Sequence, residues 1–110
     1  MVAPIIEQKK DAIDALCRKH RVRALWLFGS ATTDEWDPQS SDFDFLVDLG
    51  DYEAGIADRF LGLADDLETI VGRSIDLITV RGLAGNPRLE RRVNEHRVKL
   101  YESGRDRAVA

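Results

Sequence analysis

Apolar residues recur along the chain at two different spacings. In some stretches they stand three or four positions apart, which is typical of a helix with one buried face. In others they form short runs rich in branched and aromatic residues, which is typical of a buried strand. The predicted elements, in order, are a helix over 4–20, a strand over 22–29, a polar segment over 30–41, a strand over 42–49, a helix over 51–72, a strand over 74–80 and a helix over 86–104. This order predicts an α/β (α+β) structure in which a small mixed sheet is flanked by helices.

Turn-forming residues mark several of these boundaries. Pro4 and Pro87 suit the first turns of their helices, and Gly72 is typical of a helix end. The polar segment is expected to hold a short helical turn after Ser30 and then a loop. We expect one domain over 1–104 and a frayed tail over 105–110, because the last residues offer little to pack.

Composition narrows the class of protein. The 110 residues are 44% hydrophobic, which fits a protein with one modest core. The net charge of −4 shows no surplus of basic residues of the kind that extended nucleic-acid-binding surfaces carry. Direct nucleic-acid binding is therefore not expected. Cys17 is the single cysteine, which excludes an internal disulfide framework, and its apolar neighbours predict burial. No stretch approaches the ~20 apolar residues of a membrane span and no signal peptide is evident, so we expect a cytoplasmic protein.

Carboxylates interrupt two segments that otherwise predict buried strands. Asp42 and Asp44 stand two residues apart, so their side chains share one face of the strand. Two such charges about 5 Å apart repel by about 3 kcal/mol at an effective dielectric constant near 20, which calls for a cation or a proton. Asp76 interrupts the next predicted strand in the same way. If the two strands pair, three carboxylates meet and could hold two Mg2+ ions, as in phosphoryl transfer. Asp48, near the strand exit, is predicted to be solvated.

A second signal lies at the end of the first predicted strand. Gly29 allows backbone N–H groups to approach a ligand closely, and a helical turn opened by Ser30 would favour a phosphate group. Gly-Ser alone is common in ordinary turns. Gly-Ser followed by a spacer, an Asp-x-Asp pair and a later strand Asp is much more specific.

This combination, "LFGSATTDEWDPQSSDFDFLVDL" with "SIDLITV", resembles the minimal nucleotidyltransferases of the DNA polymerase β superfamily over nearly the whole chain. The resemblance implies the nucleotidyltransferase fold and transfer of a nucleoside monophosphate, with AMP from ATP favoured. It further implies catalytic and metal-binding roles for Asp42, Asp44 and Asp76. Nucleotide-binding roles follow for Gly29, Ser30 and Ser41.

Small members of this family are commonly antitoxins paired with a HEPN-type toxin, an all-helical ribonuclease. Some silence that toxin by adding AMP to its tyrosine. The resemblance therefore implies a HEPN-type partner and a hydroxyl acceptor for this chain. The alternative is a non-catalytic antitoxin of the same fold that neutralises the toxin by binding it. A nucleotidyltransferase acting on RNA or a small molecule is a third reading, which the short chain disfavours.

The chain departs from the family pattern just after Ser30. Many relatives place an arginine there, whereas this sequence has Thr32 and Thr33, followed by an acidic spacer. We therefore expect weaker NTP binding unless another cation substitutes, and the candidates are Arg73, Arg81 or a base of the final helix such as Arg91.

The remaining aromatic and histidine residues carry weaker signals. Trp26 is predicted to pack in the core or on the sheet face, whereas Trp36 in the polar segment could cover a base or meet a partner. His20 and His96 lack the spacing of metal ligands and are predicted at the surface or at helix ends. The basic run of the final helix is expected to be a solvated face.

Overall fold

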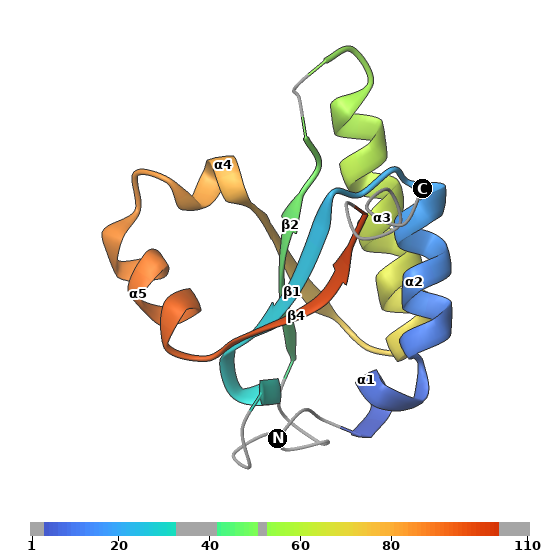
Figure 1. Cartoon of the computed structure of the whole chain (residues 1–110), viewed down its shortest axis with the longest axis horizontal. Helices are drawn as coiled ribbons and strands as arrows, with labels where there is room; N and C mark the ends of the chain where they lie inside the picture. Colours follow the sequence, from blue (N-terminus) through green and yellow to red (C-terminus); the bar gives the residue numbers. More distant parts are fainter. Residues whose placement is uncertain (1–3, 33–41, 51–52, 104–110) are drawn as a thin grey trace.

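The computed structural model describes residues 4–32, 42–50 and 53–103. Four strands form one sheet in the order β3-β2-β1-β4 (Figure 1). The strands are β1 (Ala24–Phe28), β2 (Phe43–Asp48), β3 (Ile75–Thr79) and β4 (Arg97–Glu102). β2 and β3 are parallel, whereas β1 is antiparallel to both β2 and β4, so the predicted mixed sheet is confirmed.

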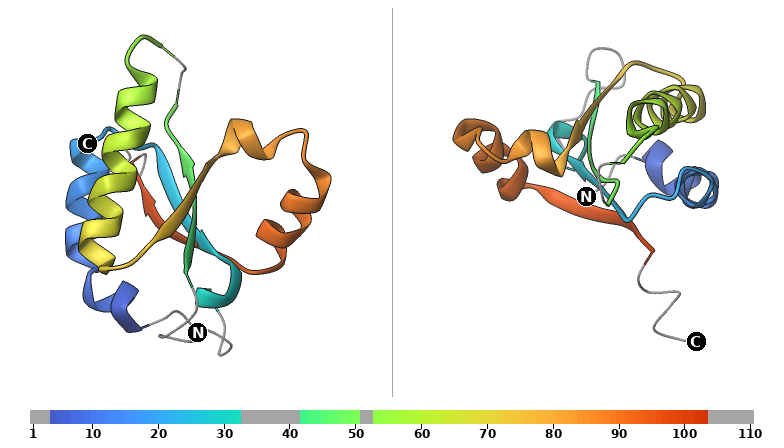
Figure 2. Two further views of the ribbon diagram at one scale, coloured as in Figure 1. Left: turned by 180° about the vertical axis from the view of Figure 1, so that it is seen from behind. Right: turned by 90° about the horizontal axis from the view of Figure 1, so that it is seen from above.

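Helices flank the sheet on both sides (Figure 2). The helices are α1 (Pro4–Gln8), α2 (Lys10–Lys19), α3 (Ile56–Val71), α4 (Val80–Leu83) and α5 (Pro87–Glu95). The longest, α2 and α3, lie side by side on one side, and α4 and α5 lie on the other. In the described segments, no helix combines the length and apolar composition that crossing a bilayer requires.

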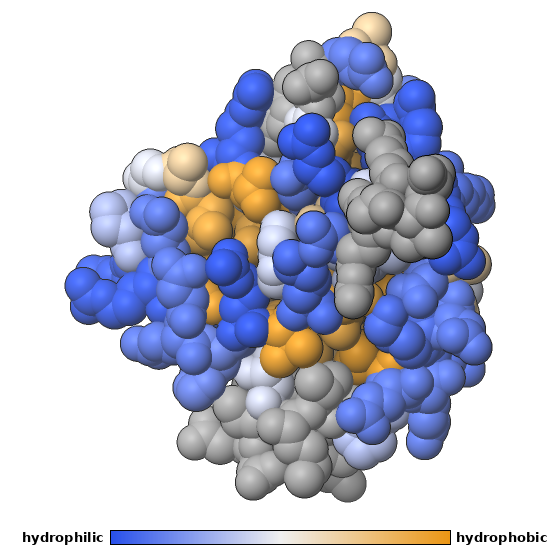
Figure 3. All heavy atoms as spheres, viewed as in Figure 1, coloured by the Kyte–Doolittle hydropathy of each residue, from blue (hydrophilic) through white to orange (hydrophobic). Residues whose placement is uncertain are grey.

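Successive side chains along each strand point to opposite faces of the sheet, and each face carries an apolar core. Side chains such as Leu25 and Phe45 point toward α2 and α3 and belong to the larger core. Their neighbours Phe28 and Leu46 point the other way, where they pack against Leu83 of α4 and Val93 of α5. Figure 3 shows hydrophilic side chains over α2 and α5, with hydrophobic side chains visible between them. The sheet is therefore the shared wall of both cores.

The predicted final helix over 86–104 is wrong in its second half. α5 ends at Glu95, and β4 then pairs with β1 at the sheet edge. Leu89, Val93 and Leu100 do fall on one helical face, which supported the longer helix. However, Val98 and Leu100 also alternate with polar residues, as in a half-buried strand. The unpaired edge of β1 decides between the two patterns, because pairing there satisfies backbone groups that a helix would leave open.

Smaller differences concern element ends. The first predicted helix is divided at Lys9 into α1 and α2, and Val80 begins α4 rather than ending a strand. The prediction that Gly72 ends a helix is confirmed, since it caps α3 with a left-handed φ of 74°. The predicted loop through Asp37-Pro38 and the tail over 105–110 lie outside the described residues.

Two predictions about individual side chains are confirmed. Cys17 is fully buried, and burial, with a smaller effect of the Asp14 charge, raises the pKa of its thiol to about 12. Trp26 packs on the sheet face against the smaller core. The guanidinium of Arg97 and the ammonium of Lys99 lie 5.3 and 5.8 Å from the centre of its ring. Such cations hold an indole in a fixed orientation.

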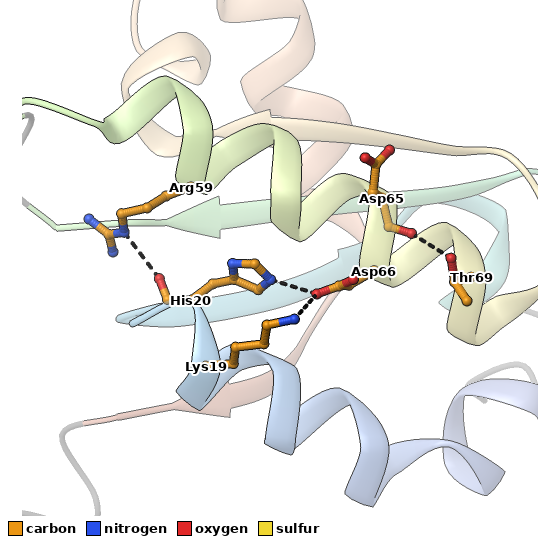
Figure 4. Close-up of polar contacts among 6 residues, drawn as sticks. All are labelled: Lys19, His20, Arg59, Asp65, Asp66 and Thr69. Atoms are coloured by element: carbon orange, nitrogen blue, oxygen red, sulfur yellow. Dashed lines mark hydrogen bonds and ion pairs between the residues drawn. The ribbon is translucent and has the colours of Figure 1, made fainter.

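The turn after α2 depends on Arg59 of α3. Arg21 adopts a left-handed φ of 55°, which costs a non-glycine residue about 1 kcal/mol or more. The Arg59 guanidinium donates to three backbone carbonyls, those of His20 at 3.1 Å, Arg21 at 2.8 Å and Leu49 at 3.2 Å. Figure 4 shows the first of these contacts joining α3 to the end of α2. Arg59 therefore ties the turn and the end of β2 to α3.

Replacing Arg59 by Met is expected to lower the free energy of unfolding by about 2–3 kcal/mol, because three carbonyls lose a charged donor. Chemical denaturation measures the change. Arg59→Lys should recover little of the loss, since one ammonium group cannot reproduce the guanidinium fork. An unchanged denaturation midpoint for Arg59→Met would contradict this account.

A second contact between α2 and α3 involves His20, which lies at the end of α2 as predicted. Its Nε2 atom is 2.7 Å from Asp66 Oδ2, and Lys19 Nζ lies 3.3 Å from the same oxygen (Figure 4). The hydrogen bond to His20 and the contact with Lys19 lower the pKa of Asp66 below its usual value.

This pKa shift predicts a pH-dependent stability difference between the natural protein and the Asp66→Asn variant. The folded pKa lies below the unfolded one, so the stabilisation is complete above the unfolded value of about 4 and disappears as pH falls through the folded value. Because Asp66 is about one-third exposed, we expect less than about 1 kcal/mol. Unfolding free energies measured from pH 3 to pH 7 should converge at the acidic end. A constant difference would contradict the assignment.

Candidate active site

Parallel pairing of β2 and β3 brings two of the predicted carboxylates together. Asp44 and Asp76 stand directly opposite each other in the register, and their side chains are hydrogen-bonded. Asp42 immediately precedes β2 with an exposed side chain, and its charge also acts on Asp44. Of the three predicted carboxylates, Asp44 and Asp76 therefore lie closest together, and Asp42 lies just before the strand with its side chain exposed.

The electrostatics of this cluster centre on Asp44. Partial burial, followed by the charge and hydrogen bond of Asp76, raises the pKa of Asp44 to about 6. The more distant Asp42 adds to the rise, while the positive charge of Arg92 opposes it. The Asp44 carboxyl is therefore protonated under mildly acidic conditions, because burial and the neighbouring negative charges disfavour its ionised form.

Gly29 closes the other side of Asp44. It ends β1 with a left-handed φ of 78° and begins the short 3-10 helix η1 (Gly29–Thr32), in agreement with the helical turn predicted near Ser30. A Cβ atom added to Gly29 would lie 2.6 Å from Asp44 Oδ2. Both the backbone conformation and this close approach therefore require glycine.

Thr32 anchors this turn. Its hydroxyl donates to the carbonyl oxygen of Gly29 at 2.8 Å and of His96 at 3.3 Å. The second contact joins the turn to the segment between α5 and β4. The buried Thr32 thus links the turn after β1 to the C-terminal end of α5.

That Arg73, Arg81 or a base of the final helix such as Arg91 substitutes for the missing arginine stays a prediction. Arg73 lies 5.8 Å from the Phe43 ring centre, and Arg81 and Arg91 are exposed on α4 and α5. Arg92, in the last turn of α5, is the residue whose charge acts on Asp44. Its spacing from Leu89, which packs on the smaller core, could have indicated the helix face that turns toward the sheet.

The site residues fit a divalent cation by their chemistry. Carboxylate oxygens are the ligands that Mg2+ prefers, and a cation beside Asp44 and Asp76 would neutralise the repulsion that raises the pKa of Asp44. Among the described residues, however, no three His, Cys, Asp or Glu side chains converge closely enough to form a ready-made metal site. Ser41 and Trp36, the other residues with a predicted role here, lie outside the described part of the chain.

The fold and the paired carboxylates define a class of protein, and comparison with known sequences identifies it. The profile of the nucleotidyltransferase domain family matches residues 9–100, so the chain belongs to this family. A Methanocaldococcus jannaschii protein, provisionally named as a protein adenylyltransferase, is 31% identical over 77 residues, covering 70% of this chain and 75% of the relative.

Solved structures share the fold. A toxin–antitoxin structure with AMP-PNP matches with a TM-score of 0.65 at 24% identity over 91% of this chain and 78% of that chain. The complex of the tri-AMPylated HEPN toxin with the MNT antitoxin from Shewanella oneidensis matches with a TM-score of 0.61 at 21% identity, over 94% and 77%. These likenesses establish the nucleotidyltransferase fold for this chain.

Proposed function

We propose that this nucleotidyltransferase moves AMP from ATP to a hydroxyl group of a protein partner, a tyrosine of a HEPN-type toxin, and thereby acts as its antitoxin. The observation that carries the proposal is the hydrogen-bonded pair of Asp44 and Asp76, packed against a glycine that ends the neighbouring strand. Two carboxylates kept together at a cost in charge repulsion are a characteristic arrangement of catalytic sites.

Each residue of the cluster has a proposed role. Asp42, Asp44 and Asp76 hold two Mg2+ ions, which neutralise phosphate charge and orient the reacting oxygens when bound. Gly29 lets Asp44 lie close to the end of β1, and the backbone N–H groups of this turn bind the triphosphate together with Ser30 and Ser41. Asp76 accepts the proton of the attacking hydroxyl as the phosphorus–oxygen bond forms and pyrophosphate leaves. Arg92 offsets part of the negative charge.

The names of relatives support a protein as the acceptor of the AMP group. The Methanocaldococcus jannaschii relative is named for adenylyl transfer to protein, and the Shewanella oneidensis complex contains an AMPylated HEPN toxin bound to its antitoxin. One of the structural neighbours was solved with AMP-PNP. These three descriptions agree with ATP as donor and a toxin as acceptor.

The test is to incubate the protein with ATP labelled on its α-phosphate, Mg2+ and the HEPN-type protein encoded beside it. We expect label on a tyrosine of that protein and none when Mg2+ is chelated. The alternative, an antitoxin that acts by binding alone, predicts that Asp42→Asn still blocks the toxin without any nucleotide. Toxin neutralisation without label transfer would overturn the proposed function in favour of that alternative.

A further inference from the structure

A polar cavity lies on the same sheet face as the carboxylates, toward the opposite end of the strands. Its volume is about 560 Å3, within the range of ligand sites. Trp26 lines it, and three cationic side chains surround it, those of Arg21, Arg23 and Lys99. Asp44 and Asp48 lie four residues apart on one face of β2, so this cavity begins about 13 Å from the carboxylate pair.

The positive charge of this cavity is not balanced by its own acids. Of the two acidic residues that line it, Glu102 lies 2.7 Å from Lys99 Nζ, and Asp48 accepts from the backbone N–H of Gly50 at 2.9 Å. The guanidinium groups of Arg21 and Arg23 are exposed, and neither has a hydrogen bond or ion pair with any described residue. Three cationic and two acidic residues line the described part of the cavity, which leaves a surplus of one positive charge on a protein whose net charge is −4.

The cavity is also held in a fixed shape. The backbone of Arg23 donates to Asp48 at 2.8 Å and accepts from Ser103 at 2.9 Å, which ties it to the ends of β2 and β4. The Arg59 contact fixes the carbonyl of Arg21, and Arg97 and Lys99 fix the Trp26 ring. A rigid aromatic surface beside two unpaired guanidinium groups suits a carboxylate-bearing chain, because guanidinium groups bind carboxylates in pairs of hydrogen bonds.

We propose that this cavity, lined by Arg21, Arg23, Trp26 and Lys99, docks an acidic segment of the acceptor protein and so places its hydroxyl at the carboxylate pair. This inference rests on the proposed transfer to a protein hydroxyl. The spacing of about 13 Å corresponds to about four residues of extended chain. An acceptor with a Glu or Asp about four residues from the modified tyrosine is therefore preferred. Guanidinium groups also bind phosphates, so a nucleic acid is the other occupant that the binding test separates.

Direct binding tests the site without any transfer. A fluorescein-labelled hexaglutamate peptide is titrated with the protein in the absence of nucleotide, and binding is followed by anisotropy. We expect binding that weakens with salt and is at least about tenfold weaker in the Arg21→Glu/Arg23→Glu variant. Lys9→Glu/Arg88→Glu changes the net charge equally at exposed positions outside the cavity and should bind as the natural protein does. If the reversed charges impair folding, Arg21→Gln/Arg23→Gln carries the comparison.

Three results would overturn the proposal: no binding of hexaglutamate to the natural protein, equal weakening by both charge-changing variants, or tighter binding of hexauridylate than of hexaglutamate. A kinetic measurement then connects the cavity to the reaction. With the HEPN-type acceptor, Arg21→Gln/Arg23→Gln should raise KM for the acceptor about tenfold, with KM for ATP and kcat unchanged. Absence of transfer by the natural protein would refute the proposed function, whereas the peptide titration is independent of it.

Discussion

Replacing Asp44 by Asn is expected to reduce nucleotidyl transfer by at least about 10³-fold while the protein stays folded. Asp44 interacts with Asp76 and lies against Gly29, so an amide there removes the central negative charge of the site. Initial rates of label transfer from ATP measure the loss. Asp65→Asn, a change of the same type on the exposed face of α3, should leave the rate unaltered.

Stability distinguishes loss of catalysis from loss of fold in this variant. The pKa of Asp44 is raised to about 6, so its carboxyl destabilises the folded state progressively as pH rises from the unfolded value of about 4 through 6. Asn carries no such charge. Without divalent cations, Asp44→Asn should therefore have a Tm at pH 8 that equals or exceeds that of the natural protein. A lower Tm, or an active Asp44→Asn enzyme, would contradict the assigned site.

Replacing Gly29 by Ala is expected to affect both stability and activity. Alanine at a φ of 78° costs about 1 kcal/mol, and its Cβ would also lie 2.6 Å from Asp44 Oδ2, so either the turn or the carboxylate must move. We expect an activity loss of about 10²-fold, since displacement of a reacting group by about 1 Å has effects of this size. Transfer rates and denaturation midpoints measure the two effects.

Gly72 provides a matched control for this substitution. It has nearly the same backbone conformation, with a φ of 74°, but a Cβ added there would contact nothing within 4 Å. Gly72→Ala should therefore reproduce the backbone cost of about 1 kcal/mol with full activity. Equal activity of Gly29→Ala and Gly72→Ala would show that the close approach of Gly29 to Asp44 does not affect the rate of transfer.

The pairing of Asp44 with Asp76 could be predicted because it depends on patterns within short stretches of the sequence. An acid that interrupts an apolar strand is costly, and two such strands joined by one helix favour parallel pairing, which sets Asp44 opposite Asp76. The sequence could not fix how far Asp42 stands from this pair, because it lies just before the strand and its position depends on a polar segment without a periodic pattern. The roles of Ser30 and Ser41 stay predictions for the same reason.

The elements that sequence reasoning missed depend on contacts between distant parts of the chain. Residues 97–102 satisfy a helical and a strand pattern almost equally, and only the free edge of β1 selects the strand. That selection ends α5 at Glu95, on a helix whose Arg92 charge acts on Asp44. Similarly, the left-handed Arg21 breaks the usual preference for glycine after a helix, and the compensating Arg59 lies in a different helix.

The pairing of β4 with β1 has a consequence for how the protein is made. β1 emerges early from the ribosome, whereas its second neighbour is among the last segments described. Until that segment emerges, β1 has an open edge, and the helix bearing Arg92 is tethered at one end only. Nascent chains would therefore acquire a complete catalytic centre only after β4 has emerged, and removing β4 should yield an aggregation-prone product rather than a smaller enzyme.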